Sequence, residues 1–172
     1  MNVPNPSEVI RTPDPAESRL LQAMDSEIEA LERLVFRSRA VMLLVAVHEF
    51  SKLFLAVDDL EAASERLAEK SLLRDLAVSE LAAARGVDEV SARSLLESTE
   101  DPFRTELEVR VERLRAGVEE ATEAHALATD LARGAIDIIG RRAEELENGG
   151  TDRLTYGSGP RIPPPPFLVR QA

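Results

Sequence analysis

The sequence predicts an all-α protein: an elongated antiparallel helical bundle, or coiled coil, of three long helices plus a short helix. Apolar residues recur at spacings of three and four along most of the chain, which places them on one face of a helix. Proline and glycine are absent from residues 16–57. The 172 residues are 44% hydrophobic but only 3% aromatic, and a core of Leu, Val and Ala suits the small layers of a thin bundle.

The expected organisation is one helical bundle, residues 14–147, between two irregular ends. Residues 1–13 contain three prolines and little periodicity, which predicts a disordered N-terminal arm. Residues 148–172 are predicted to form a flexible, Gly- and Pro-rich tail, with polyproline II structure at 163–166. Within the bundle, helices are expected at about 15–57, 60–85, 89–96 and 102–147.

The first helix is expected to begin at Asp14-Pro15, with Asp as the N-cap and Pro at the first helical position. It should continue until Asp58-Asp59, either of which can cap the second helix. Residues 40–57 are apolar around most of the helix, so we expect them to be deeply buried beneath other helices or a second chain. The predicted apolar stripe is Leu20, Met24, Ile28, Leu31, Leu34, Val35, Val41, Met42, Val45, Leu53 and Val57.

The second helix should end at Gly86, a residue suited to the left-handed conformation that follows many helices. Residues 87–100 are less regular; Asp88 can cap a short helix there, and whether this segment is helical stays open. Asp101-Pro102 repeats the pair that begins the first helix. The predicted buried face of the second helix is Leu60, Ala63, Leu67, Leu73, Leu76, Leu81 and Ala84.

The third helix carries the most regular pattern of the chain. Its alternating spacing of four and three is a heptad seam, typical of a coiled coil. We interpret His125 as a polar seam residue that fixes the register, in preference to a ligand or a base. The seam is Leu107, Val111, Leu114, Val118, Ala121, His125, Ala128, Ala132, Ala135 and Ile139.

Charge and composition exclude several classes of partner. A net charge of −11 and a pI of about 4.7 make nucleic acid and anionic membrane surfaces poor partners. The most apolar run, residues 40–47, is too short to span a bilayer, which takes about 20 residues. The first 15 residues lack the pattern of a signal peptide, so we expect a cytoplasmic protein.

No set of residues predicts catalysis, a metal site or a bound cofactor, so we expect no enzyme activity. The chain has no cysteine, and His48-Glu49 is not followed by a second His at the spacing of a zinc helix. Gly157-Ser158-Gly159 is followed by Pro160 and not by a helix, unlike a phosphate-binding loop. Protein partners are the remaining class.

Several segments of the chain resemble the FlgN-type flagellar export chaperones, most closely the forms of high-GC Gram-positive bacteria. The likeness lies in Leu31–Arg37, Phe54–Asp59, Leu72–Arg74 and Ser94–Leu96, and in the tail segment Leu154–Gly157. The resemblance implies a cytoplasmic type III export chaperone that binds the C-terminal helical segments of hook-associated proteins, which form the hook–filament junction, and delivers them to the export gate.

The resemblance also implies two sites. By match, cargo binding falls on Leu131, Ile136, Ile138 and Ile139, and docking to the export gate falls on Tyr156. From the residues alone, Ile136 and Ile138 lie off the heptad seam, and exposed apolar patches mark binding sites. Tyr156 is the only tyrosine of the chain and a plausible docking anchor, although a spacer role for its segment is equally open.

Three alternatives stay open. The same apolar surface could form a homodimer, because the sequence does not fix the oligomeric state. A structural coiled-coil adaptor or scaffold would self-associate and have no client to deliver. A helical substrate of a secretion system would be found outside the cell.

Overall fold

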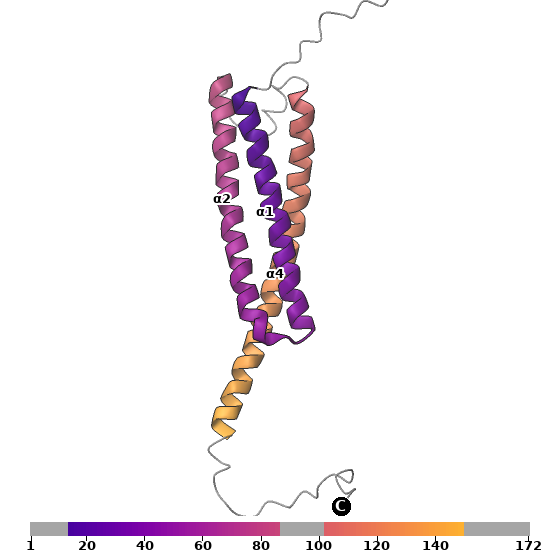
Figure 1. Cartoon of the computed structure of the whole chain (residues 1–172), viewed down its shortest axis with the longest axis vertical. Coiled ribbons are helices and arrows are strands. Elements are labelled where there is room, and N and C mark those ends of the chain that lie inside the picture. The colour runs from indigo at the N-terminus through magenta and orange to yellow at the C-terminus, as the bar shows by residue number, and fades with distance from the viewer. Residues whose placement is uncertain (1–13, 87–101, 150–172) are drawn as a thin grey trace, which may run out of the picture. The chain divides into compact units, whose positions relative to one another are not determined.

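The computed structural model describes residues 14–86 and 102–149 (Figure 1). These residues form helices and no strand, which confirms the predicted all-α class for this part of the chain. The predicted arm 1–13, the predicted short helix 89–96 and nearly all of the predicted tail lie outside it. The elements are α1 (Pro15–Ala46), the 3-10 turn η1 (Phe50–Lys52), α2 (Leu53–Arg85) and α4 (Phe103–Gly149).

Contacts divide the chain into two units, Met1–Ala135 and Ile136–Ala172. The first unit holds α1, η1, α2 and the larger part of α4. In the second unit, residues 136–149 are helical as the last part of α4.

The first helix begins where the sequence predicts. Asp14 is the N-cap, Pro15 is the first helical residue, and the Asp14 carboxylate accepts a hydrogen bond from the Ala16 amide at 3.0 Å. Glu17 accepts one from the Asp14 amide at 3.2 Å, which completes a capping box. These bonds satisfy amide groups that the first turn of a helix leaves without partners.

The first helix ends earlier than predicted. α1 stops at Ala46, and the chain turns at His48, whose backbone is left-handed with φ 58°. The Glu49 amide donates to the carbonyl of Leu44 at 2.9 Å, the bond that closes a Schellman ending. Glycine normally occupies the left-handed position of this motif, so the sequence carried no stop signal here.

The predicted cap at Asp58-Asp59 was therefore wrong. Both residues lie inside α2 and are exposed. Asp59 forms an ion pair with Arg37 of α1 at 2.8 Å. Its carboxylate thus links the two helices near the turn and caps neither of them.

The hairpin tip, residues 43–55, is much less covered than predicted. Leu43, Val47, Phe54 and Leu55 are all more than half exposed, whereas Leu53 is fully buried. The early reversal at residue 48 places this apolar stretch at the end of a hairpin. The expected deep burial of 40–57 was wrong for the single chain, and cover by a second chain stays a prediction.

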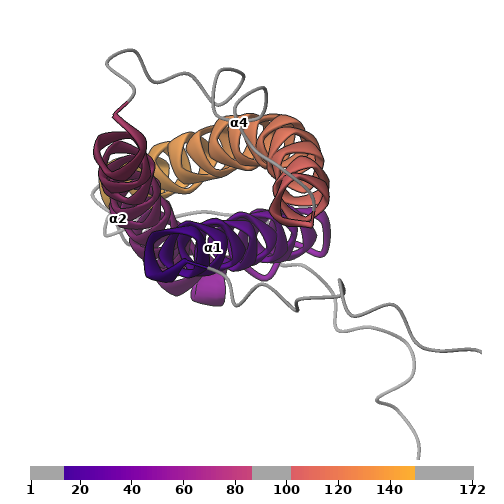
Figure 2. The same cartoon turned by 90° about the horizontal axis from the view of Figure 1, so that it is seen from above.

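α1 and α2 pack along their whole length, with the start of α1 beside the end of α2. Glu17 pairs with Arg85 at 2.7 Å, and Glu27 pairs with Arg74 at 3.3 Å. In both views α2 lies to one side of α1 (Figures 1 and 2). The predicted apolar stripe of α1 is confirmed at its buried positions Leu20, Met24, Ile28, Leu31, Leu34, Val35 and Val41.

The buried face of α2 differs from the predicted one. Leu73, Leu76 and Ala84 are exposed, whereas Ala77 and Arg74 turn toward α1. The prediction from apolar spacing failed because the charged residue Arg74 lies on the buried face of α2. The buried carboxylate of Glu27 on α1 offsets the charge of Arg74. The predicted positions Leu60, Ala63 and Leu81 are buried as expected.

α4 packs closely on α1. A methyl group added at Gly117 would lie 3.1 Å from Leu31 Cδ1, so the two helices approach closely at a position where α4 has no side chain. α4 begins one residue after the predicted start, at Phe103, and ends at Gly149 instead of about 147. The residue expected to cap it, Asp101, lies outside the described part of the chain.

The heptad seam of α4 divides into two sets. The positions that repeat every seven residues from Leu107 to Ala135 are buried, and so is Ala132. Val118 is about half exposed, and Val111, His125 and Ile139 are half-buried. The predicted seam is therefore confirmed along one edge and partly uncovered along the other. The buried set is Leu107, Leu114, Ala121, Ala128, Ala132 and Ala135.

Candidate functional site

The predicted cargo-binding residues do not fall in one compact unit. Leu131, 39% exposed, belongs to the first unit, and Ile136, Ile138 and Ile139 belong to the second. Ile138 is exposed, whereas Ile136 and Ile139 are half-buried. Tyr156, the predicted docking residue, lies outside the described residues.

Leu127 is an exposed apolar residue that the sequence reasoning missed. It lies four residues before Leu131 on α4, so the two side chains are neighbours on one face of the helix. Both are exposed, Leu127 by 53%. The heptad pattern does not indicate Leu127, because this residue lies outside the seam.

Besides these exposed residues of α4, the first unit has an apolar groove of about 440 Å³, which is bordered by α1, α2 and α4. Each helix contributes residues at helical spacing, so the groove follows the helices. Val118 and His125 from the uncovered edge of the α4 seam are on one wall. We call this surface the central groove; its lining residues are Glu27, Leu31, Leu34, Leu67, Ser71, Val118, Ala121, Thr122, His125 and Ala126.

Glu27 is the buried charge of the central groove. It is only 2% exposed. Its Oε1 accepts a hydrogen bond from Ser71 Oγ at 2.7 Å. Its Oε2 lies 3.3 Å from Arg74 Nη1 as an ion pair, yet accepts no hydrogen bond from any described residue. Arg74 thus offsets the charge of the buried Glu27 carboxylate, but the acceptor Oε2 has no hydrogen bond.

His125 adds a second unsatisfied polar atom to the same groove. Its Nδ1 is buried and has no hydrogen-bond partner among the described residues. The carbonyl of His125 accepts a bond from Thr129 Oγ1 at 2.8 Å, but the ring makes none through Nδ1. Unsatisfied buried polar atoms are uncommon in folded proteins, so two of them in one groove single out this surface.

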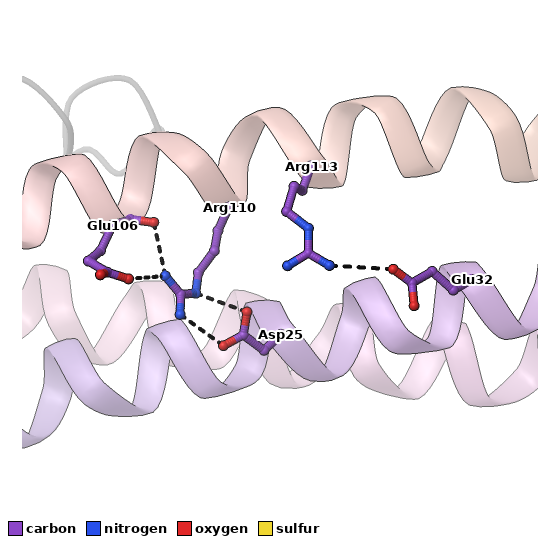
Figure 3. Close-up of polar contacts among 5 residues, drawn as sticks. All are labelled: Asp25, Glu32, Glu106, Arg110 and Arg113. Atoms are coloured by element: carbon purple, nitrogen blue, oxygen red, sulfur yellow. Dashed lines mark hydrogen bonds and ion pairs between the residues drawn. The ribbon is translucent and has the colours of Figure 1, made fainter.

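Ion pairs on the outer surface hold α4 against α1 (Figure 3). Arg110 contacts both carboxylate oxygens of Asp25, at 2.9 and 3.1 Å, and also bonds to Glu106 on its own helix. Arg113 lies 3.4 Å from Glu32. The hydrogen bonds that Arg110 donates to the Asp25 carboxylate raise the pKa of Arg110 above its ordinary value. These pairs join α1 to α4, the helix that forms one wall of the central groove.

Two negative findings concern the described part of the chain. Within residues 14–86 and 102–149, no three acidic or histidine side chains gather in a way that could hold a metal ion. Among the helices in those ranges, none combines the length and apolar character needed to cross a bilayer.

Comparison with known proteins gives no assignment. No family model matches the chain, and no curated protein or solved structure is significantly similar to it.

Proposed function

We propose that this protein is a cytoplasmic export chaperone that binds the C-terminal helical segments of hook-associated proteins and delivers them to a type III export gate. One observation carries the proposal: α4 leaves large apolar side chains exposed in a strongly acidic protein. Leu127, Leu131 and Ile138 are each more than a third exposed, and exposed apolar surface of this kind marks binding sites for other proteins.

Helical clients suit this surface for a physical reason. An amphipathic helix can lay its apolar face along an apolar groove or face of another helix. The acidic surface meanwhile keeps the chaperone soluble and repels acidic competitors, since like charges facing each other disfavour the wrong partners. The resemblance of Leu31–Arg37 and Phe54–Asp59 to FlgN-type chaperones suggests which clients to test first.

The proposal includes the finer details of the fold and the partners. The helices form an antiparallel bundle of coiled-coil type, and Tyr156 docks at the export gate after the client is bound. Leu131, Ile136, Ile138 and Ile139 contact the client.

The test is direct binding between the purified full-length chain and the C-terminal helical segments of hook-associated proteins from the same organism. We expect saturable binding by isothermal titration calorimetry. Leu131→Asp plus Ile138→Asp should weaken it at least tenfold, since each Asp places a charge where the client helix is apolar.

The matched control is Leu72→Asp plus Leu76→Asp, which makes the same change at exposed positions of α2. It should leave binding intact. Absence of any binding, together with a stable oligomer of the chain alone, would refute the chaperone proposal and favour the self-associating scaffold.

A further inference from the structure

We propose that the central groove receives one amphipathic helix of a partner protein, and that this helix presents a neutral hydrogen-bond donor to Glu27 in the middle of its apolar face. The inference rests on the proposed function and adds a second contact site for the client, besides the exposed apolar residues of α4. The site lies wholly within the first unit, on α1, α2 and α4.

The walls of the groove have the geometry of an incomplete helical bundle. Glu27, Leu31 and Leu34 of α1 follow the spacing of four and three, and Leu67 and Ser71 of α2 are four apart. Such rows are the surfaces against which a further helix packs its own side chains.

The wall formed by α4 points to the same occupant. Ala121 and its neighbouring seam positions Val118 and His125 all line the groove, and Val118 and His125 are more exposed than Ala121. A heptad seam is complete when both of its edges contact another helix. One additional helix would cover the open edge.

The polar atoms specify the chemistry of that helix. Glu27 Oε2 is an acceptor, and its negative charge is already offset by Arg74 at 3.3 Å. A second cation would be repelled by Arg74, so a neutral donor such as Asn, Gln, Ser or Thr fits better. Supplying the missing hydrogen bond removes the penalty of a buried unsatisfied acceptor, which makes the contact a determinant of specificity.

A second copy of this chain fits the groove less well than a partner does. A two-fold dimer places the same surface patch of both subunits face to face. That arrangement would set one hollow against another and one unsatisfied Glu27 acceptor against its equivalent. The net charge of −11 on each copy adds repulsion.

Photo-cross-linking with the full-length chain tests the occupant. A photoreactive phenylalanine derivative replaces Ala126, an exposed residue that lines the groove, and in a control chain it replaces Ala116, an exposed residue outside the groove on the same helix. The probe is the purified C-terminal helical segment of a hook-associated protein from the same organism. We expect a cross-link to the probe from position 126 and none from position 116.

The other outcomes separate this inference from the proposed function. If the probe binds but position 126 cross-links only to a second copy, or to residues 87–101 or 150–172 of its own chain, the groove has another occupant and the inference fails alone. The same holds if the probe binds and no cross-link forms. If the probe does not bind at all, both proposals fail.

Two substitutions test the energetics of the groove. Ala126→Trp should fill it and weaken probe binding at least tenfold, while Ala116→Trp should leave the affinity unchanged. Glu27→Gln should weaken binding about tenfold, because Ser71 keeps the amide oxygen and the NH₂ group then faces the donor of the probe.

Circular dichroism separates folding from binding in these variants. Glu27→Gln should keep the helical content of the original chain, so a loss of affinity would reflect the missing acceptor. Equal affinities of Ala126→Trp and Ala116→Trp for the probe would overturn the inference.

Discussion

α1 buries two carboxylates toward α2, whereas the carboxylates that it pairs with α4 are more exposed. Toward α2 two carboxylates are buried: Glu17 and Glu27 are each less than a twentieth exposed, and they face Arg85 and Arg74. Toward α4 the carboxylates of the ion pairs are more exposed: Asp25 pairs with the partly buried Arg110, and Glu32 pairs with Arg113 at the surface. The two helices also approach closely at Gly117 of α4, where an added methyl group would lie 3.1 Å from Leu31 Cδ1.

The burial of an ion pair decides how much the protein loses in stability when the pair is broken. Breaking a buried ion pair leaves a charge that water does not reach, so the loss is large. Breaking a surface pair returns both groups to water at little cost. The α1–α2 hairpin should therefore depend on its charges, whereas the α1–α4 contact should depend on the close approach of the helices.

The largest effect should come from Arg74→Met. This change leaves Glu27 buried with Ser71 as its remaining partner, and we expect it to lower the free energy of unfolding by about 3 kcal/mol. Urea unfolding followed by far-UV circular dichroism measures the loss. Arg113→Met, which removes a surface pair, is the matched control and should change stability by about 0.5 kcal/mol or less. Equal losses for the two variants would contradict the comparison.

The next largest effect should come from enlarging the α4 seam. Ala128 is fully buried, and Ala128→Leu forces α4 away from its neighbour, at an expected cost of about 2 kcal/mol from overpacking. The same urea titration measures it. Ala124→Leu, at a half-buried position of the same helix, should cost less; a smaller loss at Ala128 would show that the seam is loosely packed.

A smaller effect of opposite sign is expected at Gly134. A methyl group there meets nothing within 4 Å, so Gly134→Ala should raise stability by about 1 kcal/mol through helix propensity alone. At Gly117 the same change brings a methyl to 3.1 Å from Leu31, which offsets the gain. Thermal unfolding should show a higher midpoint for Gly134→Ala than for Gly117→Ala, and the reverse order would refute the close approach of α1 and α4.

The smallest loss of stability is expected from a change at Arg110. Its folded-state pKa is raised, chiefly by the hydrogen bond to Asp25. A raised pKa gives stability that is fully present below the unfolded-state value and is lost only as the pH rises through the folded-state value. Arg110→Gln should therefore cost about 1 kcal/mol or less, unchanged between about pH 6 and pH 10 and reduced by salt. A cost that varies across this pH range would point to a different partner.

The sequence predicted features that depend on local chemistry. The N-cap at Asp14 and the left-handed Gly86, with φ 67°, both follow from residue preferences at helix ends. The buried stripe of α1 followed from periodicity. The turn at His48 was missed because a residue other than glycine takes the left-handed position there.

Features that depend on contacts between different helices could not be predicted from the spacing of apolar residues. Arg74 lies on the buried face of α2 only because Glu27 of α1 offsets it, whereas the apolar Leu73 and Leu76 were assigned to that face. The central groove was missed for a related reason. A heptad pattern marks the residues suited to contact another helix, but it does not say whether the chain itself supplies that helix.

The short turn at residues 47–52 has a consequence for the order of folding. α1 and α2 are adjacent in the sequence, so the loop that joins them costs little entropy to close, and their contacts are local. During synthesis, residues 15–85 emerge before α4, and we expect a fragment ending at Gly86 to show helical structure by circular dichroism. The nascent chain thus acquires a hairpin first, and Leu31 and Leu34 face water until α4 is made.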